Sequence, residues 1–553
     1  MNRKLLLGLA LILAASSVFA GGGQSKSSAS GAGVKPGTAD SPGWMANSQN
    51  PVAFDWYVHA DWVANSVWGK SKTTQWITKK TGFDVRVITP AGNVEERLNA
   101  MIATNTLPDL ITINAGSEQY RLLVESGLVE PLNKLADQYD PYFYKATNPV
   151  TRNWYTEADG NIYAYPNSTV IPDDFVTYKG LKESGNFFSV RKDMYEAIGS
   201  PDMTTPEGFL NALRSAKQRF PTVNGQPLIP LGFEAFNDTW GGNRGMQSGL
   251  MERLAQSYEV NGKYDDPDLG PNNSEYIRWL KAFRQATVEG LIPTDIFVDK
   301  RPQIMEKIAQ GRYFASFIQM GDYYAGELAF YESGPDHIYI GVNGPLNSRK
   351  DPPKLRGVGG VAGWMITMIP KNCKDKARAL QLMTYLISEE GQRDNLFGIP
   401  GDMYTMVDGK PKRTPEHLAR LAKDRNATME EWGGSRQIFF LYSEPYEWVN
   451  QDMADLYPFE RQLRIFNRDN VVSYAQYAGV TNFEAGSNEA IAYDEIRRQW
   501  GQVLPRLLHA SSDAEFDRIW NEYQKFKADH KYDLIQTKAT ELLNINKKKI
   551  GTQ

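Results

Sequence analysis

The stretch DVRVITPAGNVEERLNAMIATNTLPDLITI, residues 84–113, contains the pattern that determines the fold class. Its two ends, 84–88 and 109–113, are short β-branched runs bounded by turn residues, which predicts two strands. Between them, Asn93 is placed to cap a helix that carries Leu98, Met101 and Ile102 on one face. A strand, a helix and a second strand form a βαβ unit, whose parallel strands must be covered on both faces. The stretch therefore predicts an α/β lobe with a mostly parallel sheet.

The same alternation continues along the chain. Thr205 followed by Pro206 predicts the start of a helix, because proline suits the first helical position. Residues 313–318, 337–342 and 363–369 have strand patterns, and the last of these leads into a helix over 375–390 that Gly391 is expected to end. The last third is mostly helical, and there Ser512 and Glu515 form a capping box before an apolar stripe.

Length and charge limit the architecture and the partners. Beyond its first 47 residues the chain has about 500 more, well past the roughly 250 to 300 at which one hydrophobic core stops growing, so at least two lobes are expected. The net charge is −4 and no long basic block occurs, which argues against a nucleic-acid partner. The single cysteine, Cys373, excludes an internal disulfide framework.

The first residues have the pattern of an export signal. Arg3 and Lys4 precede an apolar run over 5–15, and residues 18–20 give a small-x-small cleavage pattern, so residues 1–20 are predicted to be a signal peptide. The apolar run is too short for a membrane anchor. Gly21 stands where a lipoprotein would have cysteine, which predicts a protein that is free in a periplasm. Residues 21–47 are rich in Gly, Ser, Ala and Pro and are expected to form a flexible linker.

Motifs of catalysis and metal binding are weak. The five histidines are scattered without a pair at ligand spacing, so no catalytic residue, metal or cofactor is predicted. The glycine-rich run 357–363 precedes a strand and is interpreted as a chain crossing or tight turn. Glu444 with Glu447, or Asp173 with Asp174, could act as an acid/base pair on a glycoside, but that chemistry needs a defined separation in space.

Aromatic residues give the strongest hint of a ligand. They make up 12% of the chain, including 13 tryptophans, and several stand in polar or turn-like surroundings that do not suit a core stripe. An indole offers a flat apolar face to the CH-rich face of a sugar and an NH donor to its hydroxyls. We therefore expect a few of these rings to face a carbohydrate.

Several segments in order resemble extracellular solute-binding protein family 1, the group of maltose-binding and alginate-oligosaccharide-binding proteins of ABC importers. In the first half these are LPDLI (107–111), ESGLVEPL (125–132), DGNIYAYP (159–166), SVRKD (189–193) and TPEGF (205–209). Later EGLIP (289–293) follows, and FGIPG (397–401) with VDGKP (407–411) resembles the longer, oligosaccharide-binding branch. The resemblance covers nearly the whole mature chain.

This resemblance implies a two-lobe α/β periplasmic binding protein of type II, with several hinge crossings and a helical C-terminal third. It places lobe 1 at 48–166 and 357–401 and lobe 2 at 167–356 and 402–553. Solute would be held between lobes that close over it, because only the closed state contacts it from both sides. The partners implied are an oligosaccharide or other small solute and ABC permease subunits, and the protein is expected to be a monomer.

One segment departs from the alginate-binding pattern. Where those proteins have an acidic calcium loop, this chain has PTVNGQPLI (221–229), which contains no carboxylate. Calcium needs several hard oxygen ligands, so no calcium is expected there. The departure also weakens any inference that the solute is alginate.

Ligands of open α/β sheets bind beyond the carboxyl ends of strands, so the candidate residues lie in loops after strands and in the crossings. The ligand-binding candidates, with the aromatic rings, are Trp56, Trp62, Asn114, Ser117, Glu118, Tyr165, Asn167, Trp240, Gln319, Asp322, Tyr323, Trp364, Trp432 and Trp448.

Two other functions remain open at the level of sequence. The same aromatic and acidic residues would suit a secreted carbohydrate-active enzyme, and a binding protein of this kind could also present its solute to a membrane receptor as a sensor. The sequence does not identify the solute, and acidic and neutral oligosaccharides as well as peptides stay possible.

Overall fold

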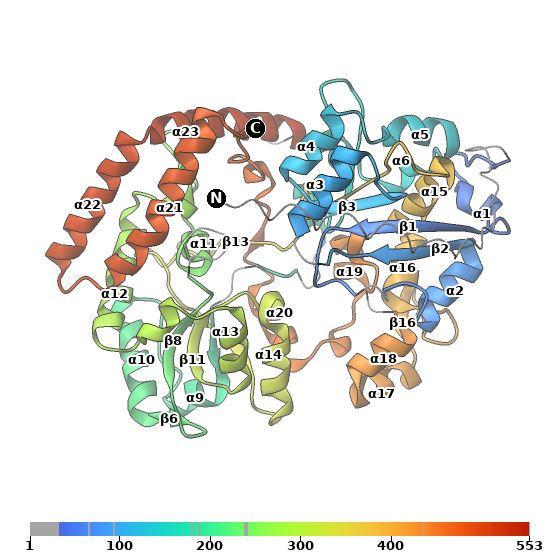
Figure 1. The fold of residues 1–553 in the computed structure, drawn as a ribbon. Helices are drawn as coiled ribbons and strands as arrows, with labels where there is room; N and C mark the ends of the chain where they lie inside the picture. The colour runs from blue at the N-terminus through green and yellow to red at the C-terminus, as the bar shows by residue number, and fades with distance from the viewer. Residues whose placement is uncertain are drawn as a thin grey trace, which may run out of the picture.

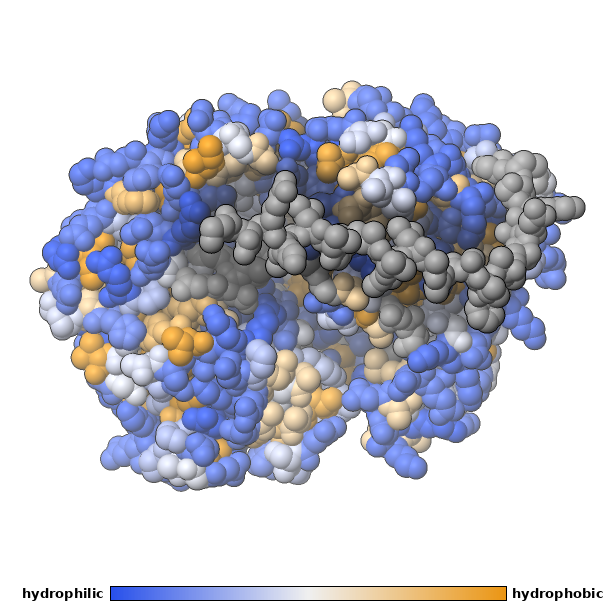
Figure 2. All heavy atoms as spheres, in the orientation of Figure 1, coloured by the Kyte–Doolittle hydropathy of each residue, from blue (hydrophilic) through white to orange (hydrophobic). Residues whose placement is uncertain are grey.

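Two α/β lobes stand side by side and are joined by several chain crossings (Figure 1). The computed structural model describes residues 33–64, 67–91, 94–178, 180, 182–185, 188–236, 242–434 and 436–551. The predicted signal peptide and cleavage site, residues 21–32 of the predicted linker, and the cap residue Asn93 lie outside these ranges. The flexible-linker prediction is wrong for residues 43–47, which belong to the first lobe, because Trp44 and Asn47 are buried there. Hydrophilic residues predominate on the face drawn in Figure 2, and hydrophobic residues are scattered over it.

The first lobe is built on a five-stranded sheet in the order β2-β1-β3-β14-β4. Its strands are β1 (Val52–Val58), β2 (Phe83–Ile88), β3 (Leu110–Asn114), β4 (Tyr165–Pro166) and β14 (Met365–Met368). The βαβ unit predicted from residues 84–113 is present as β2, α3 (Val94–Thr104) and β3, with β1 parallel to both strands. Leu98 and Ile102 of α3 are buried against the sheet, as the periodicity predicts.

Helices of the first lobe come from both ends of its sequence. They are α1 (Gly43–Ala46), α2 (Lys72–Thr81), α4 (Glu118–Glu125), α5 (Leu132–Tyr139), α6 (Phe143–Ala146), α7 (Pro149–Trp154), α15 (Lys376–Ile387), α16 (Glu389–Phe397), α17 (Pro415–Lys423) and α18 (Arg425–Trp432), with the 3-10 turn η4 (Phe439–Leu441). A hairpin of β15 (Tyr404–Val407) and β16 (Lys410–Arg413) precedes α17.

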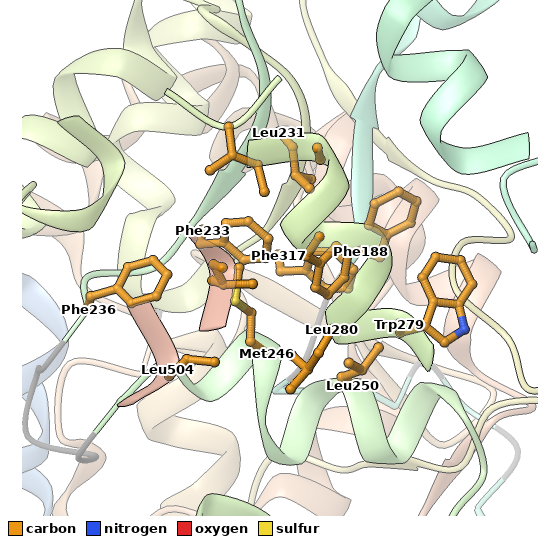
Figure 3. Packing of buried hydrophobic residues seen from close by; sticks show 14 of the residues in the cluster. Phe188, Leu231, Phe233, Phe236, Met246, Leu250, Trp279, Leu280, Phe317 and Leu504 are labelled. Carbon is orange, nitrogen blue, oxygen red and sulfur yellow. The ribbon is translucent and has the colours of Figure 1, made fainter. Parts of the chain in front are cut away.

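The second lobe has a four-stranded sheet in the order β12-β5-β11-β8. Its strands are β5 (Ser189–Arg191), β8 (Ile229–Phe233), β11 (Tyr313–Phe317) and β12 (Tyr339–Gly341). Aromatic rings fill its core: Phe233 and Phe317 stack with centroids 5.5 Å apart, and Trp279 and Leu280 lie close to them (Figure 3). This core is independent of the one under the first sheet, which is why the chain forms two lobes.

Helices enclose the second sheet and extend beyond it. They are α9 (Lys192–Ala197), α10 (Pro206–Arg219), α11 (Ser248–Arg253), α12 (Ser274–Val288), α13 (Arg301–Ala309), α14 (Met320–Glu332), α20 (Pro458–Asn467), α21 (Asn488–Leu508), α22 (Asp513–Asp529) and α23 (Tyr532–Ile550). The 3-10 turns are η1 (Arg244–Met246), η2 (Pro267–Leu269), η3 (Thr294–Phe297) and η6 (Ala475–Tyr477), and the short hairpins are β6 (Thr222–Val223) with β7 (Gln226–Pro227) and β9 (Glu259–Val260) with β10 (Lys263–Tyr264).

The last helix, α23, makes non-covalent contacts between the two lobes in addition to the chain crossings. Helix α23 runs from the second lobe toward the first (Figure 1), where the side-chain amide of Asn153 in α7 donates to the Lys549 carbonyl at 2.7 Å. The ammonium group of Lys549 in turn donates to the Trp154 carbonyl at 2.9 Å. Ile550 packs with Val361 of the glycine-rich crossing.

The crossings pack against one another in the middle of the molecule. They contain α8 (Pro172–Thr177), α19 (Glu444–Asn450), η5 (Met453–Asp455) and the pair β13 (Leu355–Arg356) with β17 (Val471–Val472). The last crossing lies later than expected. Residues 402–441, which the sequence analysis places in lobe 2, stay with the first lobe, because Ile438, Phe440 and Leu441 are buried in its core. Chain return to the second lobe is made by α20, which packs on β12.

Both sheets are mostly parallel, as expected, with one antiparallel strand each: β14 runs against β3 and β4, and β5 runs against β11 and β12. Strands that enter a lobe from the other lobe arrive from the opposite end, so they run against their neighbours. One further expectation needs correction. Gly391 does not end the helix after β14: α15 stops at Ile387, and the Ser388 hydroxyl then accepts the Gly391 amide hydrogen to start α16.

Candidate functional site

A large cavity of about 2180 Å³ lies between the two lobes. From the first lobe, the turn after β3 and the start of α4 line it. From the second lobe, the residues around the start of α14, the turn η2 and the segment 473–497 line it, and the glycine-rich crossing 356–364 forms part of its wall. The turn after β3 and the start of α14 after β11 both follow the carboxyl ends of strands, where open α/β sheets bind ligands.

Glycines 359 and 363 let two crossings lie in contact beside the cavity. Gly359 and Gly363 have φ of 83° and 60°, which disfavours any side chain. A Cβ on Gly363 would be 2.2 Å from the Asn167 carbonyl oxygen, and one on Gly359 would be 2.6 Å from that of Ser168. The run 357–363 is therefore a close backbone crossing, as the sequence analysis interpreted it.

An aromatic platform made of Trp62, Trp364 and Phe439 lines the cavity. Their three centroid distances are 6.0, 5.4 and 5.7 Å, and their ring planes lie within 23° of parallel. If the rings were stacked in one column, the centroids of the outer two would be about twice as far apart as those of neighbouring rings. The three distances are instead similar, so the rings are near-parallel and laterally offset. Trp62 is 64% exposed and Trp364 is 40% exposed, which leaves a flat apolar surface open to the cavity.

Tyrosines line the second-lobe side. The ring centroids of Tyr258, Tyr474 and Tyr477 are 5.1 to 5.7 Å apart, and Tyr264 lies 6.0 Å from Tyr477. Burial and the nearby Glu259 carboxylate raise the pKa of Tyr477 to about 12, so its hydroxyl is neutral at ordinary pH. The hydroxyls of Tyr258, Tyr474 and Tyr477 donate to Glu252, the Lys354 carbonyl and Glu259, so these tyrosines contribute ring surface to the cavity wall.

Charged side chains of the cavity are held in ion pairs. The Arg244 guanidinium donates to Glu234 at 2.7 Å and to Asp322 at 3.0 Å, and Arg301 lies 3.5 Å from the same Asp322 carboxylate. Asp266 and Asp268 line the cavity together, and burial, followed by the neighbouring Asp268 charge, raises the pKa of Asp266.

At the crossings the Glu444 carboxylate accepts a hydrogen bond from Ser168 at 2.7 Å and another from Tyr442. Burial and the charge of Glu447 raise the pKa of Glu444. Arg436 pairs with Glu447 at 2.7 Å, so the carboxylates of α19 are tied to the crossing.

Six of the predicted site residues line the cavity. They are Trp62, Ser117, Glu118, Gln319, Asp322 and Trp364. Asn114 is exposed at the end of β3 but does not line it. Trp240 lies outside the described residues.

The other six predicted residues are buried away from the cavity. Trp56 is in the central strand β1, where its NH donates to Thr112 at 2.7 Å, and Tyr165 packs edge-on against Phe143. Asn167 accepts backbone hydrogen bonds from Trp364 and Met365 and so fixes the crossing. Tyr323, Trp432 and Trp448 are also buried.

Sequence reasoning missed Phe439 and the tyrosine group. Phe439 belongs to the apolar run Ile438–Phe440, which has the pattern of a core segment, and only one of its rings turns to the cavity. The spacing of Tyr474 and Tyr477 puts both on one turn, but nothing in the sequence indicated that Tyr258 would join them.

In the part of the chain that the structure describes, no helix is long and apolar enough to cross a membrane, and no group of three or more His, Cys, Asp or Glu side chains could hold a metal ion. The segment expected to lack calcium forms the β6–β7 hairpin, with Asn224 and Gly225 at its turn.

Comparison with known families and structures gives a consistent result. The family described as bacterial extracellular solute-binding protein matches residues 72–399. No curated protein sequence matches the chain.

Among solved structures, the chain is similar to the alginate-binding protein AlgQ2 determined without calcium ion, at 18% identity and a TM-score of 0.58, covering 89% of this chain and 98% of that one. It is also similar to FusA of Streptococcus pneumoniae, an ABC-transporter substrate-binding protein in complex with kestose, at 16% identity and a TM-score of 0.62, covering 89% and 99%. An extracellular solute-binding protein of Bifidobacterium longum subsp. infantis matches at 16% identity and a TM-score of 0.63, covering 90% and 99%. At these identities the likeness establishes the fold, and it confirms the two-lobe binding-protein class.

Proposed function

This chain belongs to the bacterial extracellular solute-binding proteins, and from that premise we propose that its interlobe cavity captures an oligosaccharide for delivery to an ABC-type permease. The aromatic platform of Trp62, Trp364 and Phe439 is the observation that carries the proposal. Flat, parallel and partly exposed rings suit the CH faces of sugars. The tyrosine group on the second lobe supplies a further aromatic surface to the same cavity.

Size supports a solute longer than one sugar. Small-molecule pockets usually measure about 300 to 1,000 Å³. The cavity here measures about 2180 Å³, so it has room for several linked rings. The relatives named above include proteins described as binding alginate and kestose, which agrees with a carbohydrate solute.

Closure over the solute is the mechanism we propose. The platform belongs to the first lobe and its crossing, whereas the tyrosine group belongs to the second lobe. A solute that touches both surfaces binds the closed state better than the open one and shifts the population toward it. The permease would then recognise the closed form.

The test is a binding and turnover assay with purified protein and a panel of oligosaccharides. Saturable quenching of tryptophan fluorescence, confirmed by calorimetry and without any new product by chromatography, is the expected outcome. Bond cleavage would instead support a secreted carbohydrate-active enzyme, in which carboxylates that line the cavity would act as acid and base. Saturation by peptides and by no glycan would refute the carbohydrate assignment.

Export and monomeric action complete the proposal. The basic residues, apolar run and cleavage pattern of residues 1–20 support a cleaved signal, and Gly21 supports a mature protein that is free in a periplasm. Osmotic-shock release of a monomer whose sequence starts at Gly21 is the expected result. Protein that stays with membranes after a high-salt wash would contradict it.

A further inference from the structure

The charges that line the cavity are unequal in number. Of the described lining residues, six are arginines and none is lysine, whereas nine are carboxylates. The arginines are Arg121, Arg244, Arg301, Arg356, Arg436 and Arg497, and the carboxylates are Glu118, Glu125, Glu183, Asp266, Asp268, Asp322, Glu444, Glu484 and Asp494. The formal charge of the wall is therefore −3 when all are ionised.

Every one of these arginines already faces a carboxylate of the protein. Arg121 lies 3.5 Å from Glu484 and near two further glutamates of its own helix, and Arg497 lies 3.5 Å from Asp494. The distances for the pairs of Arg356 with Glu252 and Arg436 with Glu447 are 3.3 and 2.7 Å. Arg244 and Arg301 share Asp322, as described above.

An acidic sugar would enter this cavity at a disadvantage. Carboxylates are recognised best by an arginine whose two donors are available to them. At Arg244, the least exposed of the six, a sugar carboxylate would have to displace Glu234 or Asp322 and leave it inside the cavity without its partner, which is costly. The pairs of Arg121, Arg301, Arg356 and Arg497 are more exposed and are weaker obstacles. The wall's excess of negative charge adds repulsion at each further acidic unit of a chain.

Neutral sugars can form favourable hydrogen bonds with the same carboxylates. Hydroxyl groups donate hydrogen bonds, and the ionised carboxylates of the wall only accept them. Asp266 and Asp268 lie near Tyr258 and Tyr264; burial raises the pKa of both carboxyls, and each accepts from sugar hydroxyls when it is ionised. Asp322 and Gln319 supply similar acceptors at the start of α14.

We infer that the solute is a neutral oligosaccharide and that the acidic wall of the cavity excludes uronate-containing chains. This inference rests on the proposed function and narrows it to a substrate class. Selectivity of this kind comes from disfavouring acidic chains, which meet repelling carboxylates in the cavity, and not from extra contacts to neutral chains.

The experiment compares neutral and acidic oligosaccharides of equal length by calorimetry. The neutral set contains malto-, cello-, manno-, xylo- and galacto-oligosaccharides, and the acidic set contains oligogalacturonates and oligomannuronates. We expect saturable binding of at least one neutral chain, with every acidic chain roughly 100-fold weaker or worse. An acidic chain that binds as tightly as the best neutral chain overturns this inference and leaves the proposed function intact. Absence of saturation by every glycan overturns the proposed function itself.

Variants of the wall test the electrostatic cause. Glu484→Gln removes an exposed carboxylate beside Arg121, and Asp322→Asn removes the one between Arg244 and Arg301. Each should reduce the preference for neutral chains roughly tenfold, mainly by improving acidic binding, and added salt should reduce the wild-type preference in the same direction. Glu484 is on an exposed segment, so its variant is informative even if Asp322→Asn folds poorly.

Glu522→Gln is the matched control, because it removes an exposed carboxylate paired with Arg518 on α22, away from the cavity. It should leave the preference unchanged. An unchanged preference in the folded Glu484→Gln variant, together with no effect of salt, would overturn the electrostatic explanation.

Discussion

Removal of the Trp62 side chain is the most direct test of the aromatic platform. Trp62 is the most exposed of the tryptophans in the described part of the chain, and its ring lies 5.4 Å from Phe439 and 6.0 Å from Trp364. The substitution Trp62→Ala removes a ring that contributes little to the core, so the protein should fold normally. Solute affinity should fall.

The size of the effect follows from the exposed area. Large aromatic side chains bury about 150–250 Å² when covered. With 64% of Trp62 exposed and only one of its faces available to a sugar, about 75 Å² would be covered, worth about 2 kcal/mol at about 25 cal/mol per Å². This corresponds to roughly a 20-fold rise in Kd. Trp364, which is 40% exposed, should give about 1.2 kcal/mol, or roughly eightfold.

The assay is isothermal titration with the neutral oligosaccharide that binds most tightly in the panel. Trp62→Phe should recover most of the affinity, because a smaller flat ring is retained. Trp76→Ala is the matched control: Trp76 is a partly exposed tryptophan of α2 that does not line the cavity, and its loss should leave Kd unchanged. One kcal/mol corresponds to about a fivefold change in Kd. A rise in Kd of less than about threefold for folded Trp62→Ala would therefore refute the role of the platform.

Three further predictions concern stability, each checked by urea unfolding. Trp56→Ala should lower the free energy of unfolding by about 3–5 kcal/mol, because it opens a cavity in β1 and removes the hydrogen bond to Thr112; a loss below about 1 kcal/mol would contradict the core placement. Gly363→Ala should cost roughly 1–3 kcal/mol or more, because its φ is 60° and its Cβ would meet the Asn167 carbonyl, whereas the open site Gly360→Ala should cost little. Burial, and then the charge of Glu460, raise the pKa of Glu327 from 4.5 to about 8, so this group stabilises the fold fully below pH 4.5 and progressively less as the pH rises through 8. Glu327→Gln should therefore be more stable than wild type at pH 8.5 by at least about 1.4 kcal/mol, the value of one pKa unit, and equal stability at pH 5 and pH 8.5 in both proteins would show that the carboxyl is not perturbed.

Local features of the fold could be predicted from the sequence. The βαβ unit at 84–113, the helix begun by Thr205 and the helix begun by Asp375 are all present, because periodicity and capping act over a few residues. In the last of these helices the start was predicted and the end was not. Helix α15 ends at Ile387, and Ser388 caps the start of α16, so Gly391 lies inside the second helix and does not end the first.

Trp56 and Trp62 show what the sequence could not decide. They are six residues apart and both were candidates for the cavity, yet one is fully buried and the other is the most exposed tryptophan of the described chain. Burial of Trp56 depends on β3, β14 and η4 covering the central strand, and these segments come from residues far away in the chain. No local pattern contains that information.

The sequence by itself determined two α/β lobes and an abundance of aromatic rings, because hydrophobic period and chain length are local or additive properties. Only the tertiary structure decided which rings meet and which charges are paired. The platform joins residues 62, 364 and 439, and the cavity arginines find their carboxylates across helices and crossings. Such contacts depend on how separate segments pack, and packing is a property of the whole chain.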